Sequence, residues 1–196
     1  MASILKVDTI QDQSGNNIIN ENADTITIGA SGDTITVPTG ATLTNNGTLG
    51  AGMGKVLQVV FGSTTTQVNN NTTSFTDTGL SASITPSSTS NKVLIIVNQS
   101  HKTQDPSALS AGSAIKLLRG STDIYGDVRP YEIFMQIGSS TNIQFYDRYN
   151  LNYLDSPSTT SATTYKTQGR AYQSGDELVV QPEDIESTII LMEIAG

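Results

Sequence analysis

Short runs of β-branched and aliphatic residues, each ended by a cluster of turn residues, recur along most of the chain and constrain its fold more than any other feature. From residue 55 onward about nine such runs alternate with clusters such as "TPSSTSN" and "DSPSTTSA". No long segment carries a helical period. The pattern predicts an all-β protein in which residues 55–196 form a β-sandwich of the jelly-roll type. The expected strands are 55–61, 74–84, 91–100, 114–125, 131–138, 143–154, 163–172, 176–181 and 187–195.

A shorter phrase is written three times within residues 23–49, as "DTITI", "DTITV" and "ATLTN". Alternation in a strand puts its aliphatic residues on one side and its threonines on the other. So few aliphatics cannot form a core alone, and repeats of this kind need neighbours. We therefore predict that three chains intertwine here as a β collar, with a polar linker as the alternative. The collar residues are Ile26, Ile28, Ile35, Val37 and Leu43.

The remaining segments complete a four-part organisation. Residues 1–22 carry a short apolar patch, which we predict to be an anchoring segment, and the glycines of residues 50–54 predict a flexible joint. Residues 23–49 are then the collar and residues 55–196 a head domain. The predicted anchor residues are Ile4, Leu5, Val7 and Ile10.

Two of the predicted strands are apolar on both faces, unlike a strand with one face in water. In residues 91–100 the second face would carry Leu94 and Ile96, and in residues 187–195 it would carry Ile190, Met192 and Ile194. A strand of this kind is covered on both sides. Another subunit or a loop of the same chain would supply the second cover.

Composition excludes several classes of function. The net charge is −8, with 10 Lys and Arg scattered along 196 residues, so we expect no nucleic-acid binding. Without cysteine there is neither a disulfide framework nor a thiolate metal site. No apolar run has the length of a signal peptide or a membrane span, which predicts synthesis in a cytoplasm and no membrane insertion.

The residues available for catalysis are few, and we predict neither an enzyme nor a bound cofactor or metal. His101 is the only histidine and has no nucleophile signature beside it, which favours a surface residue at a strand end. The carboxylates, Asp147 among them, show no spacing that pairs them across a cleft. "QPEDIES", from residue 181 to 187, is typical of a solvated turn, with a structural cation as the alternative.

Aromatic residues cluster in and around residues 143–154. Alternate residues of this strand, Phe145, Tyr149 and Tyr153 among them, point to one face and are expected in the core. The residues between them point to the other face, which is expected in solvent. Tyrosine beside Asp, Asn and Arg can stack on a sugar ring and hydrogen-bond its hydroxyl groups. The predicted receptor-contact residues are Tyr125, Tyr131, Tyr146 and Arg148.

Longer phrases carry a resemblance to a known group of proteins. "MASILKVDTIQDQSGNNIINENADTITIGASGDTITVPTGATL" resembles the N-terminal segment shared by structural proteins of marine and cyanobacterial tailed phages. "VLQVV", "SFTDTGLSASITPSSTSNKVLIIV", "IKLLRGSTDI", "LDSPSTTSATTYKTQ" and "STIILMEIAG" resemble a domain that often follows it. Residues 126–145 match no shared phrase and are expected to carry what is particular to this chain.

The resemblance implies a virion component, commonly a tail fibre, and such proteins are usually homotrimers. It brings no catalytic residues with it. The expected partners are sister chains, other virion proteins and a host surface polysaccharide. The expected location is the virion, with the tail favoured over the capsid surface. A capsid decoration protein is the first alternative, and a tail enzyme that degrades polysaccharide is the second.

Overall fold

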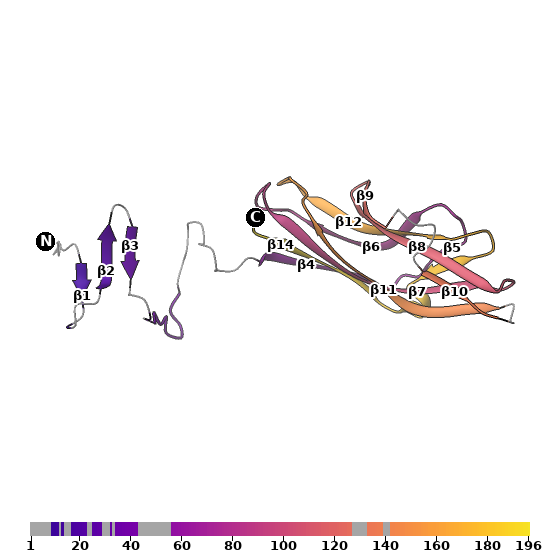
Figure 1. Ribbon diagram of the computed structural model, residues 1–196, viewed down its shortest axis with the longest axis horizontal. Helices are drawn as coiled ribbons and strands as arrows, with labels where there is room; N and C mark the ends of the chain where they lie inside the picture. Colours follow the sequence, from indigo (N-terminus) through magenta and orange to yellow (C-terminus); the bar gives the residue numbers. More distant parts are fainter. Residues whose placement is uncertain are drawn as a thin grey trace. The chain divides into compact units, whose positions relative to one another are not determined.

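The computed structural model describes residues 9–11, 13, 17–22, 25–28, 32, 34–42, 56–126, 133–138 and 142–196. The chain divides into two compact units, Met1–Gly50 and Ala51–Gly196 (Figure 1). No helix in the described part of the chain is long and apolar enough to cross a bilayer.

The N-terminal unit contains a small antiparallel sheet. Its strands are β1 (Thr9–Gln11), β2 (Asn17–Asn22) and β3 (Thr25–Ile28), in the order β1-β2-β3. The first repeat thus forms β3, whereas residues 34–38 of the second repeat lie outside any strand. A sheet of three short strands has little surface to bury on its own.

The C-terminal unit is a sandwich of two antiparallel sheets (Figure 1). One sheet has the order β10-β8-β12-β6, with β9 paired to β8, and the other has the order β4-β14-β7-β13-β5, with β11 paired to β7. The strands are β4 (Val56–Thr64), β5 (Val68–Asn70), β6 (Thr76–Ile84), β7 (Lys92–Asp105), β8 (Ser110–Arg119), β9 (Thr122–Tyr125), β10 (Ile133–Gln136), β11 (Ile143–Asp155), β12 (Thr163–Ala171), β13 (Glu177–Val180) and β14 (Ser187–Ile194).

The strand order is that of a jelly roll, which confirms the predicted fold class. The chain alternates between the sheets as it runs through β6, β7 and β8, and again from β10 to β13. The last strand, β14, returns between β4 and β7. The four-strand rows β4-β14-β7-β11 and β6-β12-β8-β10 therefore face each other as two interlocked Greek keys.

The structure corrects the sequence prediction at three strands. The run predicted as one strand over residues 114–125 is a hairpin of β8 and β9, which turns at Gly120 with φ 60°. β5 lies between the predicted strands 55–61 and 74–84, where no strand is predicted, because three residues are too few for a periodic signal. β7 continues to Asp105, beyond the predicted end at residue 100, because β11 and β13 pair with it on both sides.

Alternation of apolar side chains builds the core between the sheets. Val93, Ile95 and Val97 of β7 are fully buried, as are Ile189 and Leu191 of β14. A second, smaller cluster lies around Ile115, Ile133, Leu178 and Val180. Phe145 packs on the smaller cluster, Tyr153 packs on the larger one, and Tyr149 contacts both, which confirms the prediction for these three aromatics.

The opposite face of the β4-β14-β7-β11 sheet is also apolar at one end. Cross-strand neighbours form one row of Phe61, Ile190 and Ile96, and a second row of Val59, Met192, Leu94 and Leu154. We call these seven residues the apolar face. Phe61 is 61 % exposed, Val59 58 % and Leu154 50 %. In the single chain the predicted second cover is therefore missing over these described residues.

Candidate functional site

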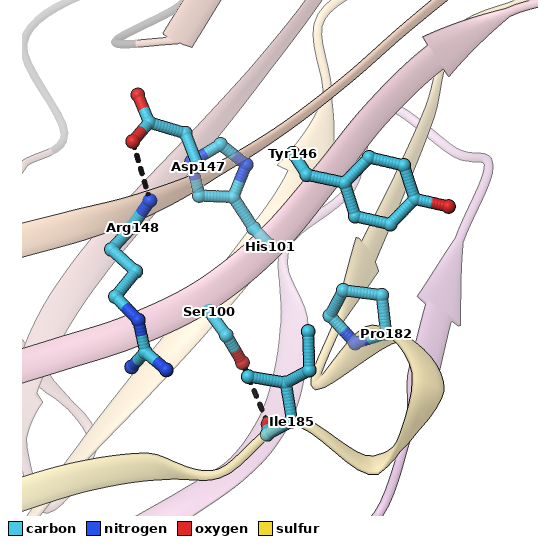
Figure 2. A pocket seen from close by; sticks show the side chains of 7 residues that line it. All are labelled: Ser100, His101, Tyr146, Asp147, Arg148, Pro182 and Ile185. Carbon is cyan, nitrogen blue, oxygen red and sulfur yellow. Dashed lines mark hydrogen bonds between the residues drawn. The ribbon is translucent and has the colours of Figure 1, made fainter.

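A pocket of about 230 Å³ lies where β13 ends and β14 begins, beside β7 and β11 (Figure 2). It is smaller than the 300–1,000 Å³ typical of pockets for drug-sized ligands, so it has room for a group the size of one sugar ring. Its lining comes from three separate segments of sequence. The lining residues are Ser100, His101, Tyr146, Asp147, Arg148, Pro182 and Ile185.

Strand pairing brings two of these segments together. β11 runs antiparallel to β7 along its whole length, so that Asp147 lies opposite His101 and Arg148 opposite Ser100. The third segment is η1 (Pro182–Asp184), a short 3₁₀ turn that closes one side of the pocket. Its backbone is anchored to β7, because the Ser100 hydroxyl donates to the Ile185 carbonyl over 2.8 Å.

The turn beside the pocket holds a strained backbone. Gln181, Glu183 and Asp184 all have left-handed conformations, with φ of 50°, 55° and 59°. Residues other than glycine adopt this conformation at a cost in free energy, so contacts with the surrounding structure must stabilise it. Here the backbone N–H of Gln181 donates to the Ser100 carbonyl over 3.1 Å, and the Gln181 side chain is fully buried. The prediction of a solvated turn therefore holds only for the exposed residues 183–186.

Tyr146 and Arg148 meet at the rim of this pocket, as two of the four predicted receptor-contact residues. The Tyr146 ring is half exposed, Lys102 Nζ lies 5.7 Å from its centre, and its hydroxyl donates to Glu183 over 3.2 Å. Partial burial and the Glu183 carboxylate raise the pKa of the Tyr146 hydroxyl, so it stays a hydrogen-bond donor. Arg148 Nη1 donates to the Asn98 side chain and, over 3.2 Å, to the Glu186 carbonyl.

The other two predicted contact residues do not join this site. Tyr125 is exposed on β9, and its ring lies 5.8 Å from that of Tyr153. Tyr153 and Tyr146 are seven residues apart on β11, which separates them by roughly 23 Å. One small ligand cannot span that distance. Tyr131 lies outside the described residues.

His101 is buried, so the prediction of a surface histidine at a strand end is wrong. It lies within β7, is only 2 % exposed, and its ring packs edge-on against Phe145 at 5.9 Å. Burial lowers the pKa of His101 to about 4, against the opposing effect of Asp147, so the ring is neutral at pH 7. Its Nδ1 atom is buried without a hydrogen-bond partner.

Ser100, His101 and Asp147 line one pocket, but they do not form a hydrolytic relay. Such a relay needs the serine hydroxyl hydrogen-bonded to the histidine and the histidine hydrogen-bonded to the carboxylate. The Ser100 hydroxyl is instead committed to the Ile185 carbonyl, and His101 Nδ1 has no partner. Asp147 accepts a hydrogen bond from the Arg148 backbone over 2.7 Å (Figure 2).

The arrangement is suited to recognition of a small polar ring. An exposed tyrosine ring offers a stacking surface, Pro182 and Ile185 add apolar walls, and the Arg148 guanidinium offers hydrogen-bond donors. Sequence reasoning missed Pro182 and Ile185 because nothing local shows that residues 181–187 return to β7. In the described part of the chain, no group of three His, Asp or Glu side chains could hold a metal ion.

The side chains of most predicted anchor and collar residues lie outside the part of the chain that the structure describes. Ile4, Leu5, Val7 and Leu43 are not among the described residues, and of Ile26 and Ile28 only the place in β3 is described. Ile10, Ile35 and Val37 are exposed in the single chain, by 40 %, 63 % and 44 %. Their role in assembly stays a prediction.

Comparison with known proteins finds no matching family model and no matching curated protein. Among solved structures, the infectious bursal disease virus VP2 subviral particle aligns at 14 % identity and a TM-score of 0.32, over 72 % of this chain and 38 % of that one. Structures from two strains of the same virus align similarly. The Gt strain structure aligns at 16 % identity and a TM-score of 0.33, over 87 % of this chain and 47 % of that one. The Gx strain structure aligns at 11 % identity and a TM-score of 0.31, over 71 % of this chain and 37 % of that one. The chain spans less than half the length of each.

Proposed function

We propose that this chain is a virion structural protein, a subunit of a trimeric phage tail fibre or spike. In this proposal the N-terminal unit docks on the particle and joins the three chains, and the jelly-roll unit presents the pocket at Tyr146 and Arg148 to a host surface polysaccharide. The function is binding, and no reaction is assigned to the site.

The observation that carries the proposal is the division of the chain into two unlike units. The jelly roll has a complete core of its own, whereas the N-terminal sheet has three short strands followed by exposed apolar residues such as Ile35 and Val37. A unit of this kind is completed by other chains. The sequence resemblance to phage structural proteins supports a particle as the place of that assembly.

A weak contact at the pocket suits this function. One sugar ring in a shallow pocket binds weakly, but three heads on one fibre bind a repetitive polysaccharide together, and effective concentration multiplies the affinity.

The capsid decoration role is the second candidate, because the same jelly roll can cover a capsid while the N-terminal unit joins neighbouring subunits.

Immunogold electron microscopy of intact particles, with antibody against residues 55–196, separates the two candidates. Label confined to the tail is the expected result and supports the fibre. Label spread over the head would replace the fibre with the decoration role. Particles without label would contradict both.

Binding at the pocket is tested on an array of bacterial surface polysaccharides. We expect that Tyr146→Ala and Arg148→Ala each weaken binding to the best ligand about tenfold, because stacking and charge-assisted hydrogen bonds are lost. Tyr125→Ala is the matched control, an exposed tyrosine on β9 beside Tyr153, and should leave binding unchanged. Equal loss in all three variants would contradict the pocket.

A further inference from the structure

We infer that the apolar face of the head domain is an interface with a second copy of this chain. The face is a continuous surface across four strands, since Phe61 neighbours Ile190 and Ile190 neighbours Ile96. In the adjacent row, Met192 lies between Val59 and Leu94. Hydrogen-bonded neighbouring strands lie about 4.8 Å apart, so these side chains are in register for contact with a single partner surface.

The size of the face matches the largest apolar patch that a single chain normally exposes to water. Three of its side chains are half exposed or more, and four others are partly exposed, which amounts to several hundred Å². The largest apolar patch of a typical monomer is about 300–600 Å² and is often functional. A stable interface buries about 800 Å² per partner, so the apolar face would form the centre of such a contact and the polar residues around it the remainder.

The chemistry of the face is that of a contact between like subunits. Its seven residues include no charged side chain, and interfaces between identical subunits are the more apolar kind. The edge is polar along one side, where Ser63, Thr188 and Asn98 form the next row of the sheet. A chain of net charge −8 repels its own copies over most of its surface, so a charge-free area is where two copies can approach.

The position of the face in the sequence also favours a sister chain as the partner. β4 supplies Val59 and Phe61 and is the first strand after the N-terminal unit. Only residues 43–55 separate the described part of the repeats from β4. If the repeats join as proposed above, sister heads are tethered close to this face and the contact becomes intramolecular. The face itself does not depend on that collar.

The absence of cysteine from the chain allows a direct test. Ser63→Cys places one thiol at the polar edge of the face and leaves all seven apolar residues intact. Treated with a short bis-maleimide, the full chain should give a covalent dimer on a denaturing gel. Ser174→Cys is the matched control, an exposed serine in the turn between β12 and β13. We expect at least tenfold less dimer from it.

A second variant shows whether the apolar face causes the contact. Phe61→Lys, added to Ser63→Cys, should lower the dimer yield at least tenfold, because it puts a charge into the interface. Phe61 is 61 % exposed, so the fold should survive, and an unchanged thermal midpoint confirms this. Equal yields from Ser63→Cys and Ser174→Cys, no dimer at all, or no effect of Phe61→Lys would each overturn the inference. Loss of the collar alone would change the sedimentation of the full chain and leave the dependence on Phe61 in place.

Discussion

Glu193 shows how one residue can stabilise one end of the sandwich. Its carboxylate is 1 % exposed and has no ion pair among the described residues. It accepts hydrogen bonds from Gln58 of β4 and Asn91 before β7, both at 2.6 Å, and from the backbone and hydroxyl of Ser87. A buried charge is stable only with such partners. Burial would raise the pKa of Glu193, but these donors outweigh it and lower the pKa to about 2.

The lowered pKa predicts acid sensitivity centred on Glu193. A carboxyl with a pKa of about 2 in the folded chain and 4.5 when exposed stabilises the fold fully above pH 4.5, and this stability is lost as the pH falls toward 2. Glu193→Gln should therefore lower the free energy of unfolding by about 3 kcal/mol at pH 7 and by much less at pH 2.

Urea unfolding followed by circular dichroism at the two pH values measures the effect. Glu186→Gln, an exposed carboxylate in the turn before β14, is the control and should change stability by under about 0.5 kcal/mol at either pH. If Glu193→Gln lowers the free energy of unfolding equally at pH 7 and pH 2, the charge of Glu193 does not stabilise this end of the sandwich.

At the scale of elements, the two sheets lie close together where β4 passes β6. A Cβ atom at Gly62 would lie 2.5 Å from the Ser81 carbonyl oxygen and 3.1 Å from the Ala82 side chain. The oxygen belongs to backbone, which cannot rotate aside as a side chain can. The glycine therefore lets an edge strand of one sheet cross an edge strand of the other.

We predict that Gly62→Ala destabilises the head by about 1–3 kcal/mol, because the methyl group forces β4 and β6 apart. Gly138→Ala is the matched control, since nothing lies within 4 Å of a Cβ atom there. The shift of the urea midpoint measures both variants. If Gly62→Ala unfolds at the same midpoint as Gly138→Ala, the close approach of the two strands does not limit stability.

At the scale of the whole molecule, the proposed assembly rests on the N-terminal repeats. We predict that Ile26→Asp or Ile35→Asp weakens the proposed trimer at least tenfold, because each would put a charge into the proposed apolar contact between chains. Thr36→Asp adds the same charge on the threonine side of the predicted collar and should leave the proposed trimer intact. Sedimentation velocity of the full chain across concentrations measures the change. An unchanged subunit count in both isoleucine variants would contradict an intertwined collar.

Local pattern was enough to determine most of the β architecture. Alternation of β-branched residues between turn clusters located most strands of the head and its sandwich class, because alternation reflects one buried face per strand. It also assigned Phe145, Tyr149 and Tyr153 to the core side of β11 and Tyr146 to the solvent side. Periodicity acts over neighbouring residues, which is why it succeeds within a strand.

Only the tertiary structure decided what lies beside what. His101 is buried because β7 continues past it, which puts its side chain on the same face as Ile95 in the core and against Phe145 of β11. The pairing with β11 and β13 that extends β7 is not encoded by any local pattern. The pocket exists because residues 181–185 return to β7 after a gap of some eighty residues in the sequence. The apolar face likewise joins four strands that are distant along the chain. Contacts of this kind depend on the order of strands in a sheet, which the sequence encodes through the whole fold and not through any short stretch.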